Sequence, residues 1–304
     1  ADASPAAAAI FATADAALGE SISALAFDGP EDQLNRTENA QPALLATSIA
    51  YLSAAHERAH ATGMTIPNPL FYAGHSMGQY SAMVAASALT LPDGVRLVRE
   101  RGRRMQASGE GRDGAMAAVL GLDEEQLPEL IRRASEHGVF AVANRNSPGQ
   151  VVISGDRAAI EAAAEIAREL GAKRALVLPV SVAAHSPLME QAAEGMREVL
   201  AGVEFREPTA ALLANADARP ILDGEAARAE LIEHLTAGVD WVAAVRKMVA
   251  DGVDTFLEVG PGKVLTNLIK RIAPDASAIA LDDVLAGAGI DLPFLVPSDP
   301  SHLS

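Results

Sequence analysis

Apolar and polar residues alternate along this chain in segments that are typical of an α/β protein. The most informative segment spans residues 69–86. Apolar residues at 69–72 predict a strand, and small apolar residues at 81–86 predict a helix. Between them lies Gly74-His75-Ser76-Met77-Gly78. A strand, a sharp turn carrying a serine and a helix form a nucleophile elbow, so we predict that Ser76 is a nucleophile.

The two glycines of this turn, Gly74 and Gly78, should let the strand and the helix pass closely with no Cβ between them. Ser76 can then occupy a strained turn with its Oγ exposed. The new helix directs unpaired N–H groups at this site, and the N–H of Met77 is the natural donor to an oxyanion formed there.

Around the elbow the pattern is mainly helical. Residues 6–25 predict one helix and residues 43–61 a second, which the segment 37–42 could start, and no strand is readable before Pro69. A break at 91–94 precedes a basic helix at 95–106, which Asp93 could cap.

The pattern of apolar residues changes after the polar, glycine-containing segment 109–114. Strands are predicted at 115–120, 139–144, 150–154 and 175–180, with helices at 124–137 and 157–170. This β-α-β-β-α-β order is the ferredoxin-like pattern, and we interpret residues 113–181 as an inserted small domain.

The remaining segments return to the large domain, which we assign to residues 1–112 and 182–290. Ser186-Pro187 should cap and start a helix that ends near Gly202. The other predicted elements are strands at 211–215 and 255–259 and helices at 226–235, 241–250 and 264–272. We expect the Pro-rich segment from Leu285 onward to be peripheral, and we assign residues 291–304 as a tail.

Composition narrows the possible functions. The 304 residues carry 24 Lys+Arg against 40 Asp+Glu, a formal charge of −16 that argues against a nucleic-acid partner. No apolar run approaches the roughly 20 residues of a membrane helix, and the Ala-rich start does not resemble a signal peptide. The absence of cysteine excludes disulfides, thiolate metal sites and cysteine nucleophiles. We therefore expect a cytoplasmic protein without a thiolate metal site, and we further expect a monomer with no bound metal.

A serine nucleophile needs a base, and the seven histidines can be sorted by position. His185 follows a strand end and precedes a helix start, a place where α/β enzymes position catalytic groups, so we predict that it is the base. His75 is adjacent to Ser76 on a sharp turn and should point away from it. Four others have positions that favour structural roles: His56, His60, His137 and His302.

Two further roles stay open at this point. His185 could be oriented by a backbone carbonyl or by one of three carboxylates, Asp217, Asp240 or Glu258. Arg101, within the basic run 99–104, is either part of a solvated face or a bidentate clamp for a carboxylate.

Five motifs in register resemble the malonyl-CoA:acyl carrier protein transacylases, the acyltransferase family of fatty-acid and polyketide synthesis. They are residues 74–78, the Arg-Gly-x-x-Met-Gln run 101–106, Asn146 to Val152, Pro179-Val180-Ser181 leading to His185, and 258–262. The resemblance implies an α/β-hydrolase-like large domain with a ferredoxin-like insertion.

The resemblance also implies a ping-pong reaction without a cofactor. Ser76 would take malonyl from malonyl-CoA with His185 as base, and the phosphopantetheine thiol of an acyl carrier protein would receive it. Arg101 would clamp the malonyl carboxylate, with Met77 and Asn146 as further substrate-binding residues.

The chain departs from the family pattern at several positions. His234, whose backbone carbonyl would orient His185, replaces a Gln, and Gly238 replaces a Pro, which should loosen that loop. Gln79 replaces the usual Glu. The Gly-Gln-Gly-Ser-Gln loop that supplies a second oxyanion donor is absent before Ser76, either because the sequence starts after it, which we favour, or because it is lost.

Two rival functions remain. An ester or thioester hydrolase would share the elbow but would not need Arg101 or the small domain, and a non-catalytic docking protein would explain the absent loop.

Because acyl carrier proteins are acidic, carrier contact should be confined to local basic residues, although these could equally form a solvated face. The candidates are Lys173, Arg174, Lys263, Lys270 and Arg271.

Overall fold

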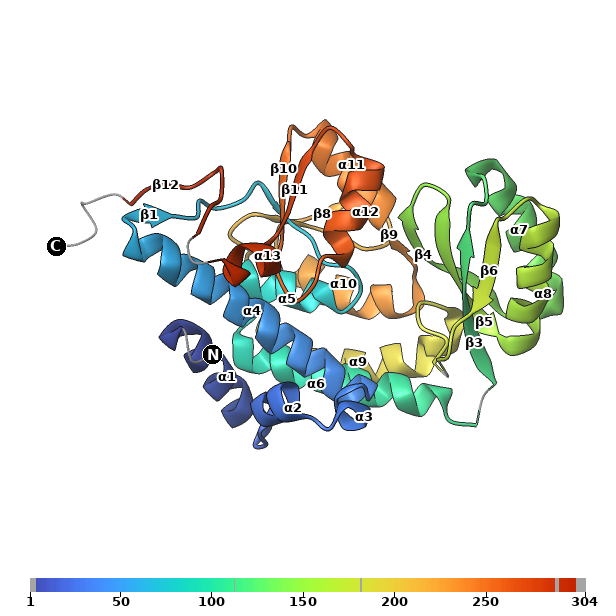
Figure 1. The fold of residues 1–304 in the computed structure, drawn as a ribbon. Coiled ribbons are helices and arrows are strands. Elements are labelled where there is room, and N and C mark those ends of the chain that lie inside the picture. Colours follow the sequence, from blue (N-terminus) through green and yellow to red (C-terminus); the bar gives the residue numbers. More distant parts are fainter. Residues whose placement is uncertain (1–3, 112, 181, 288–289, 299–304) are drawn as a thin grey trace.

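The computed structural model describes residues 4–111, 113–180, 182–287 and 290–298 and has an α/β architecture. A body rich in helices lies beside a smaller unit built on one sheet (Figure 1). Ser181, His302 and the end of the tail, 299–304, lie outside the described residues.

The chain opens with helices. These are α1 (Pro5–Leu18), α2 (Ile22–Asp28), the short α3 (Glu31–Leu34) and the long α4 (Thr37–Ala61). Ser4 caps α1 by accepting a hydrogen bond from the Ala7 N–H, and Gly19 ends it in the left-handed conformation. One strand does precede Pro69: β1 (Met64–Thr65) pairs with β12 (Val296–Pro297), away from the elbow strand. The tail is therefore less peripheral than predicted, and Leu292 is buried.

The elbow connects β2 (Phe71–Tyr72) to α5 (Gly78–Ala85), and α6 (Leu91–Gly109) follows. The predicted break at 91–94 is wrong, because these residues form the first turn of α6. Thr90, not Asp93, is its N-cap: Thr90 Oγ1 accepts from the Asp93 N–H at 3.2 Å and donates to Asp93 Oδ2 at 2.6 Å. Helix α6 crosses the start of α4 at Gly102, where a Cβ would lie 2.6 Å from Glu38 Cα. This close crossing brings Arg101 beside Gln41.

The smaller unit has the predicted order of strands and helices. Its elements are β3 (Gly114–Leu120), a 3₁₀ turn and α7 (Leu127–Ala134), β4 (Phe140–Ser147), β5 (Gln150–Asp156), α8 (Arg157–Glu169) and β6 (Arg174–Val177). The strands lie in the order β6-β3-β5-β4, all antiparallel, and α7 and α8 cover one face (Figure 1). A fifth strand, β9 (Val239–Asp240), pairs parallel with β4 and links this sheet to the rest of the chain.

The remaining strands form two short sheets within the described residues. In one, β2 pairs parallel with β7 (Ala211–Leu213), which pairs with β8 (Pro220–Ile221); in the other, β10 (Thr255–Glu258) pairs parallel with β11 (Ser277–Ala280). The helices of this part are α9 (Glu190–Ala201), after a 3₁₀ turn at Pro187–Met189, α10 (Gly224–Thr236), α11 (Trp241–Ala250), α12 (Val264–Ile272) and α13 (Leu281–Ala286).

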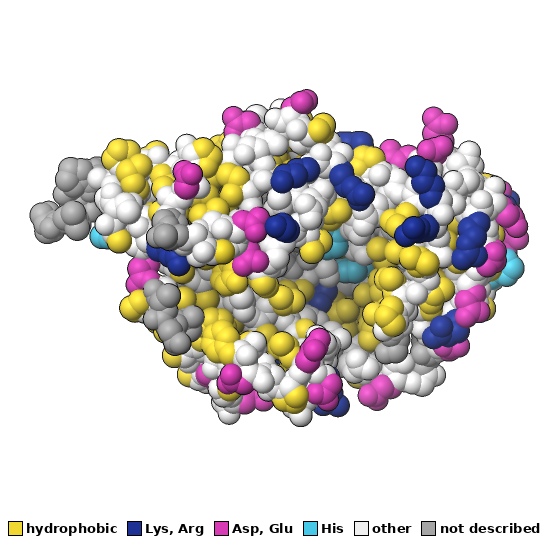
Figure 2. Space-filling view, in the orientation of Figure 1, with side chains coloured by type: hydrophobic (Ala, Val, Ile, Leu, Met, Phe, Trp, Pro, Cys, Tyr) yellow, Lys and Arg dark blue, Asp and Glu magenta, His cyan; other side chains and the backbone are white. Residues whose placement is uncertain are grey.

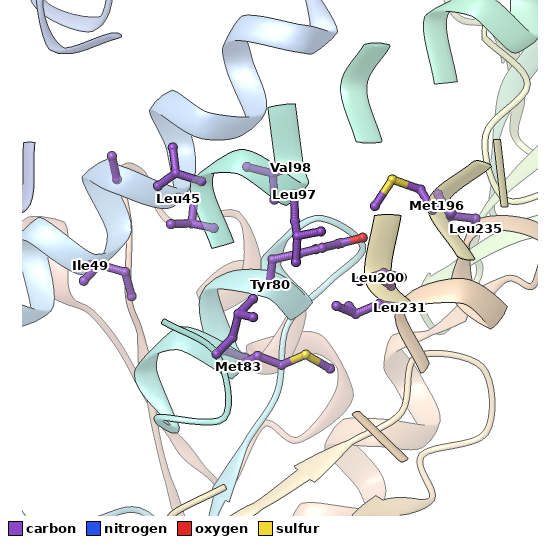
Figure 3. Packing of buried hydrophobic residues seen from close by; sticks show 14 of the residues in the cluster. Leu45, Ile49, Tyr80, Met83, Leu97, Val98, Met196, Leu200, Leu231 and Leu235 are labelled. Carbon is purple, nitrogen blue, oxygen red and sulfur yellow. The ribbon is translucent and has the colours of Figure 1, made fainter. Parts of the chain in front are cut away.

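A large apolar core supports the elbow from behind. Tyr80 of α5 is fully buried and packs among side chains from α4, α6, α9 and α10 (Figure 3). The cluster includes leucines from these four helices, and fully burying one leucine side chain contributes about 1.5–3 kcal/mol to the free energy of folding. Burial of the cluster therefore fixes the helices that carry the site. Among the described helices, none combines the length and apolarity that crossing a membrane requires.

Candidate active site

The elbow places Ser76 in a strained backbone conformation, with φ at 54°. The tight turn depends on Gly74, because a Cβ there would lie 2.1 Å from the carbonyl carbon of Gly78. The expectation for Gly78 is wrong: a Cβ on it would meet no atom within 4 Å. Gly78 contributes the backbone that Gly74 approaches, and only Gly74 needs to lack a side chain.

His185 lies directly against the serine, with its Nε2 at 2.7 Å from Ser76 Oγ. Its Nδ1 is 2.6 Å from the His234 carbonyl oxygen and 3.1 Å from that of Ala237. Two carbonyl acceptors require the proton to be on Nδ1, so Nε2 is left as the acceptor for the Ser76 hydroxyl. His185 also has a positive φ, 57°.

The three candidate carboxylates make other contacts. Asp217 pairs with Arg219, Asp240 Oδ1 accepts from the Ala243 N–H at the start of α11, and Glu258 accepts from two N–H groups at the start of α12. Backbone carbonyls are therefore the groups that contact the His185 Nδ1.

The loop after α10 is packed rather than loosened by its glycine. A Cβ on Gly238 would lie 2.5 Å from the Val142 carbonyl oxygen of β4, and the next two residues pair with that strand. The expected loosening is wrong because glycine allows this close approach to β4.

The surroundings favour a neutral His185. Burial and then the positive charge of Arg101 lower the pKa of His185 to about 3, against the opposing effect of its hydrogen bond to the His234 carbonyl. A neutral imidazole with a free Nε2 lone pair can accept the proton of Ser76 at neutral pH.

Arg101 is buried, with 2% of its surface exposed, so it is not part of a solvated face. Its Nη2 donates to Ser76 Oγ at 3.1 Å, and its Nη1 donates to Gln41 Oε1 at 2.8 Å. Within the described parts of the chain, no carboxylate lies within ion-pair distance of it, and burial lowers the pKa of Arg101. A buried guanidinium without a counter-ion, beside a nucleophile, is suited to an anionic ligand.

The side of the site toward the small sheet is formed by His75 and Asn146. His75 Nε2 lies 2.8 Å from Asn146 Oδ1, and its ring lies 5.8 Å from that of Trp241. His75 therefore faces away from Ser76, and Asn146 reaches the elbow through it. Figure 2 shows a hollow between the helical body and the small sheet unit, with histidine and basic side chains inside it.

Some residues of the site were missed by the sequence reasoning. Gln41 holds Arg101, and Asn215 Oδ1 accepts a hydrogen bond from the Ser76 N–H at 2.8 Å. Asn215 comes two residues after the end of β7, and a polar residue at the carboxyl end of a strand was a signal that could have found it. Gln79, whose effect was unpredicted, accepts from the Gly74 N–H and donates to the Leu213 carbonyl, two roles that an amide can combine.

The five basic candidates for carrier contact are exposed, two of them on or beside β6 of the small sheet and three on or beside α12. Arg271 of α12 donates to Gln150 Oε1 at 2.6 Å. Gln150 is opposite Leu120, which is opposite Arg174, so Gln150 and Arg174 are two strand spacings, about 10 Å, apart. Lys173, Lys263 and Lys270 are on the same elements or next to them, although Lys263 also lies 3.3 Å from Asp283.

No cluster of His, Asp or Glu side chains in the described residues could hold a metal ion.

Comparisons with known proteins agree on one family. Residues 1–286 match the family described as Acyl transferase domain. The malonyl CoA-acyl carrier protein transacylase of Bacillus subtilis strain 168 is 43% identical over 280 residues, which cover 92% of this chain and 86% of that protein. The acyl carrier protein S-malonyltransferase structure from Vibrio cholerae has a TM-score of 0.86 at 39% identity, covering 91% of this chain and 89% of that one. A malonyl-transacylase solved in complex with a type II PKS acyl-carrier protein has a TM-score of 0.87 at 39% identity, covering 94% of this chain and 90% of that one.

Proposed function

This chain belongs to the acyl transferase domain family, among the malonyl CoA-acyl carrier protein transacylases, and we propose that it moves malonyl through a Ser76 acyl-enzyme. The donor is malonyl-CoA, and the acceptor is the phosphopantetheine thiol of an acyl carrier protein. The pathway served is fatty-acid or polyketide synthesis.

In the first half-reaction Ser76 Oγ attacks the thioester carbon while its proton passes to His185 Nε2, 2.7 Å away. The tetrahedral intermediate collapses, the C–S bond breaks, and the CoA sulfur leaves with the proton from His185. In the second half-reaction the carrier thiol gives its proton to His185 and attacks the acyl-serine. Ser76 then recovers its proton, and malonyl is on the carrier.

Met77 is the proposed oxyanion donor. It stands at the N-cap of α5, and among the described groups none accepts a hydrogen bond from its N–H. A backbone N–H directed at the developing oxyanion contributes about 3–4 kcal/mol to transition-state stabilisation.

The observation that supports malonyl as substrate is the buried Arg101, which reaches Ser76 Oγ without a carboxylate partner. An acyl chain with a free carboxylate, bound on Ser76, would bring its negative charge to this guanidinium. Asn146 is a further proposed substrate contact, since it lies against His75, the neighbour of Ser76.

The direct test mixes the protein with malonyl-CoA and follows CoA release and intact mass. We expect a burst of one CoA per chain and a malonyl adduct on Ser76, neither of which Ser76→Ala should show. Persistence of the adduct in that variant would contradict the proposal. Continued CoA release without a carrier would favour the hydrolase, and no burst at all would favour the docking protein.

Carrier docking is proposed for the five basic residues on or beside β6 and α12, because all five are exposed to an acidic carrier and the Arg271–Gln150 hydrogen bond brings α12 against the small sheet. Charge reversal of Arg174 and Lys270 should raise KM for the carrier and leave KM for malonyl-CoA unchanged. The control is Arg206→Glu, an exposed arginine paired with Glu204 on another part of the chain. An unchanged carrier KM would remove these residues from the docking surface.

We also propose the domain division 1–112 and 182–290, 113–181, and tail 291–304. The strand order β6-β3-β5-β4 with two helices on one face supports a ferredoxin-like small domain, and the parallel pairing of β2 with β7 supports a hydrolase-like large one. The absence of a cofactor, the monomeric state and the cytoplasmic location stay predictions.

A further inference from the structure

The side chain of Asn215 spans the elbow. Its Oδ1 accepts from the Ser76 N–H at 2.8 Å, and its Nδ2 donates to the Gly74 carbonyl at 3.0 Å. Asn215 is 4% exposed, so both bonds are shielded from water. One amide therefore fixes the peptide groups on both sides of His75 and holds Ser76 in its left-handed conformation.

Asn215 is itself held from two sides. Its own N–H donates to Glu230 Oε1 at 2.7 Å, and its carbonyl accepts from the Asp240 N–H at 2.7 Å. Glu230 is 1% exposed and lies on α10. Its second oxygen is 3.7 Å from the half-exposed Arg219, which bonds more closely to Glu233.

The same helix also holds the base. Four residues after Glu230, the His234 carbonyl accepts from His185 Nδ1 at 2.6 Å. Helix α10 thus reaches Ser76 through Glu230 and Asn215, and reaches His185 through its last turn.

We propose that Asn215 and Glu230 are positioning residues, which set the nucleophile elbow against His185 by tying both to α10. The proposal rests on the proposed function, since it concerns the reactivity of Ser76. Neither residue acts on the substrate directly. Their role is to keep Ser76 Oγ within hydrogen-bond distance of His185 Nε2, and a displacement of about 1 Å can lower a rate by about 10²-fold.

The test compares variants by the rate constant of Ser76 acylation in a rapid-mixing experiment with malonyl-CoA. We expect Asn215→Ala to lower this rate constant by about 10²-fold while KM changes by less than about threefold. Glu230→Ala should act in the same direction. Glu230→Gln should restore most of the loss, because its amide oxygen can still accept from the Asn215 N–H. The matched control is Glu233→Ala, one turn along on the exposed side of α10, which should acylate at the wild-type rate.

A second measurement separates positioning from stability. Reaction of Ser76 with a small sulfonyl fluoride needs no substrate binding, and only folded protein, verified by thermal unfolding, is compared. Slow modification of folded Asn215→Ala and Glu230→Ala supports the proposal. Wild-type rates in both, or equal loss in Glu230→Gln and Glu230→Ala, would overturn it. If wild-type protein itself forms no malonyl adduct, the proposed function fails, whereas the sulfonyl fluoride rates still test the positioning role.

Discussion

Gln41 and Arg101 are joined by a buried hydrogen bond from Nη1 to Oε1 of 2.8 Å. The bond fixes the plane of the guanidinium, so that its other nitrogen points at Ser76 Oγ. Because the Gln41 amide is neutral, it orients the cation without cancelling its charge. A site that must bind an anionic acyl group needs this combination of a held but uncompensated arginine.

Gln41→Glu tests this relationship. The new carboxylate would pair with Arg101 and compete with the carboxylate of malonyl. We expect KM for malonyl-CoA to rise at least tenfold, since a charged hydrogen bond contributes about 1.5–3 kcal/mol. Gln33→Glu, an exposed change of the same kind on α3, should leave KM unchanged. A KM for malonyl-CoA in Gln41→Glu equal to that of the wild-type protein would mean that Arg101 does not contact the substrate carboxylate.

The pKa of His185 gives a prediction about pH. Because burial and Arg101 lower this pKa to about 3, His185 is neutral throughout the usual assay range. The pH dependence of kcat/KM for malonyl-CoA reports the ionisation of groups in the free enzyme. The midpoint of its acid limb should therefore lie well below pH 6.5. A midpoint between pH 6 and 7 would contradict the lowered pKa.

The same shift predicts acid sensitivity of the fold. Between about pH 6.5 and 3 the unfolded chain binds a proton at His185 and the folded chain does not, so this histidine makes stability fall as pH is lowered. The pKa of His75 and that of His234 are also lowered by burial and act with the same sign. Burial raises the pKa of Glu230 to about 7, which acts with the opposite sign, but three histidines outweigh one carboxyl group. Urea-induced unfolding measured at pH 7 and at pH 5 should give the lower free energy of unfolding at pH 5. Equal values at the two pH values would contradict the lowered pKa values.

The two elbow glycines should respond differently to alanine. The Cβ of Gly74→Ala would collide with the Gly78 backbone, so we expect a loss of about 1–3 kcal/mol in the free energy of unfolding. Gly78→Ala adds its Cβ in open space at the start of α5 and should be neutral or stabilising by up to about 1 kcal/mol. Denaturant unfolding of both variants checks this, and equal losses would contradict the asymmetry.

Local signals explain what the sequence could predict. The strand-turn-helix pattern around Ser76 is encoded in adjacent residues, and so is the β-α-β-β-α-β order of the small unit. The position of His185 after a strand end was also a local signal. Strands of two residues, such as β8 and β9, were not readable because so few residues carry no period.

The contacts that complete the site depend on tertiary structure. Gln41 meets Arg101 across 60 positions, and Asn215 meets Ser76 across 139. No pattern of residue spacing in the sequence predicts contacts between residues so far apart. The choice between carboxylates and carbonyls as partners of His185 was likewise decided by packing, because Asp240 and Glu258 serve as helix caps.

Arg101 itself sets the expected selectivity. If its guanidinium pairs with the malonyl carboxylate, an acetyl group leaves a buried cation without a partner, and two charged hydrogen bonds amount to a preference of at least about 10²-fold for malonyl. Arg101→Ala should lower kcat/KM for malonyl-CoA by that factor and leave acetyl-CoA equal or better. Arg99→Ala is the matched control, because Arg99 is also buried on α6 but pairs with Glu20 and Asn39, away from Ser76. That control should keep the malonyl preference even if it lowers the melting temperature. If Arg101→Ala slows malonyl and acetyl transfer by one common factor, Arg101 supports the elbow only, and the carboxylate must be recognised by another group.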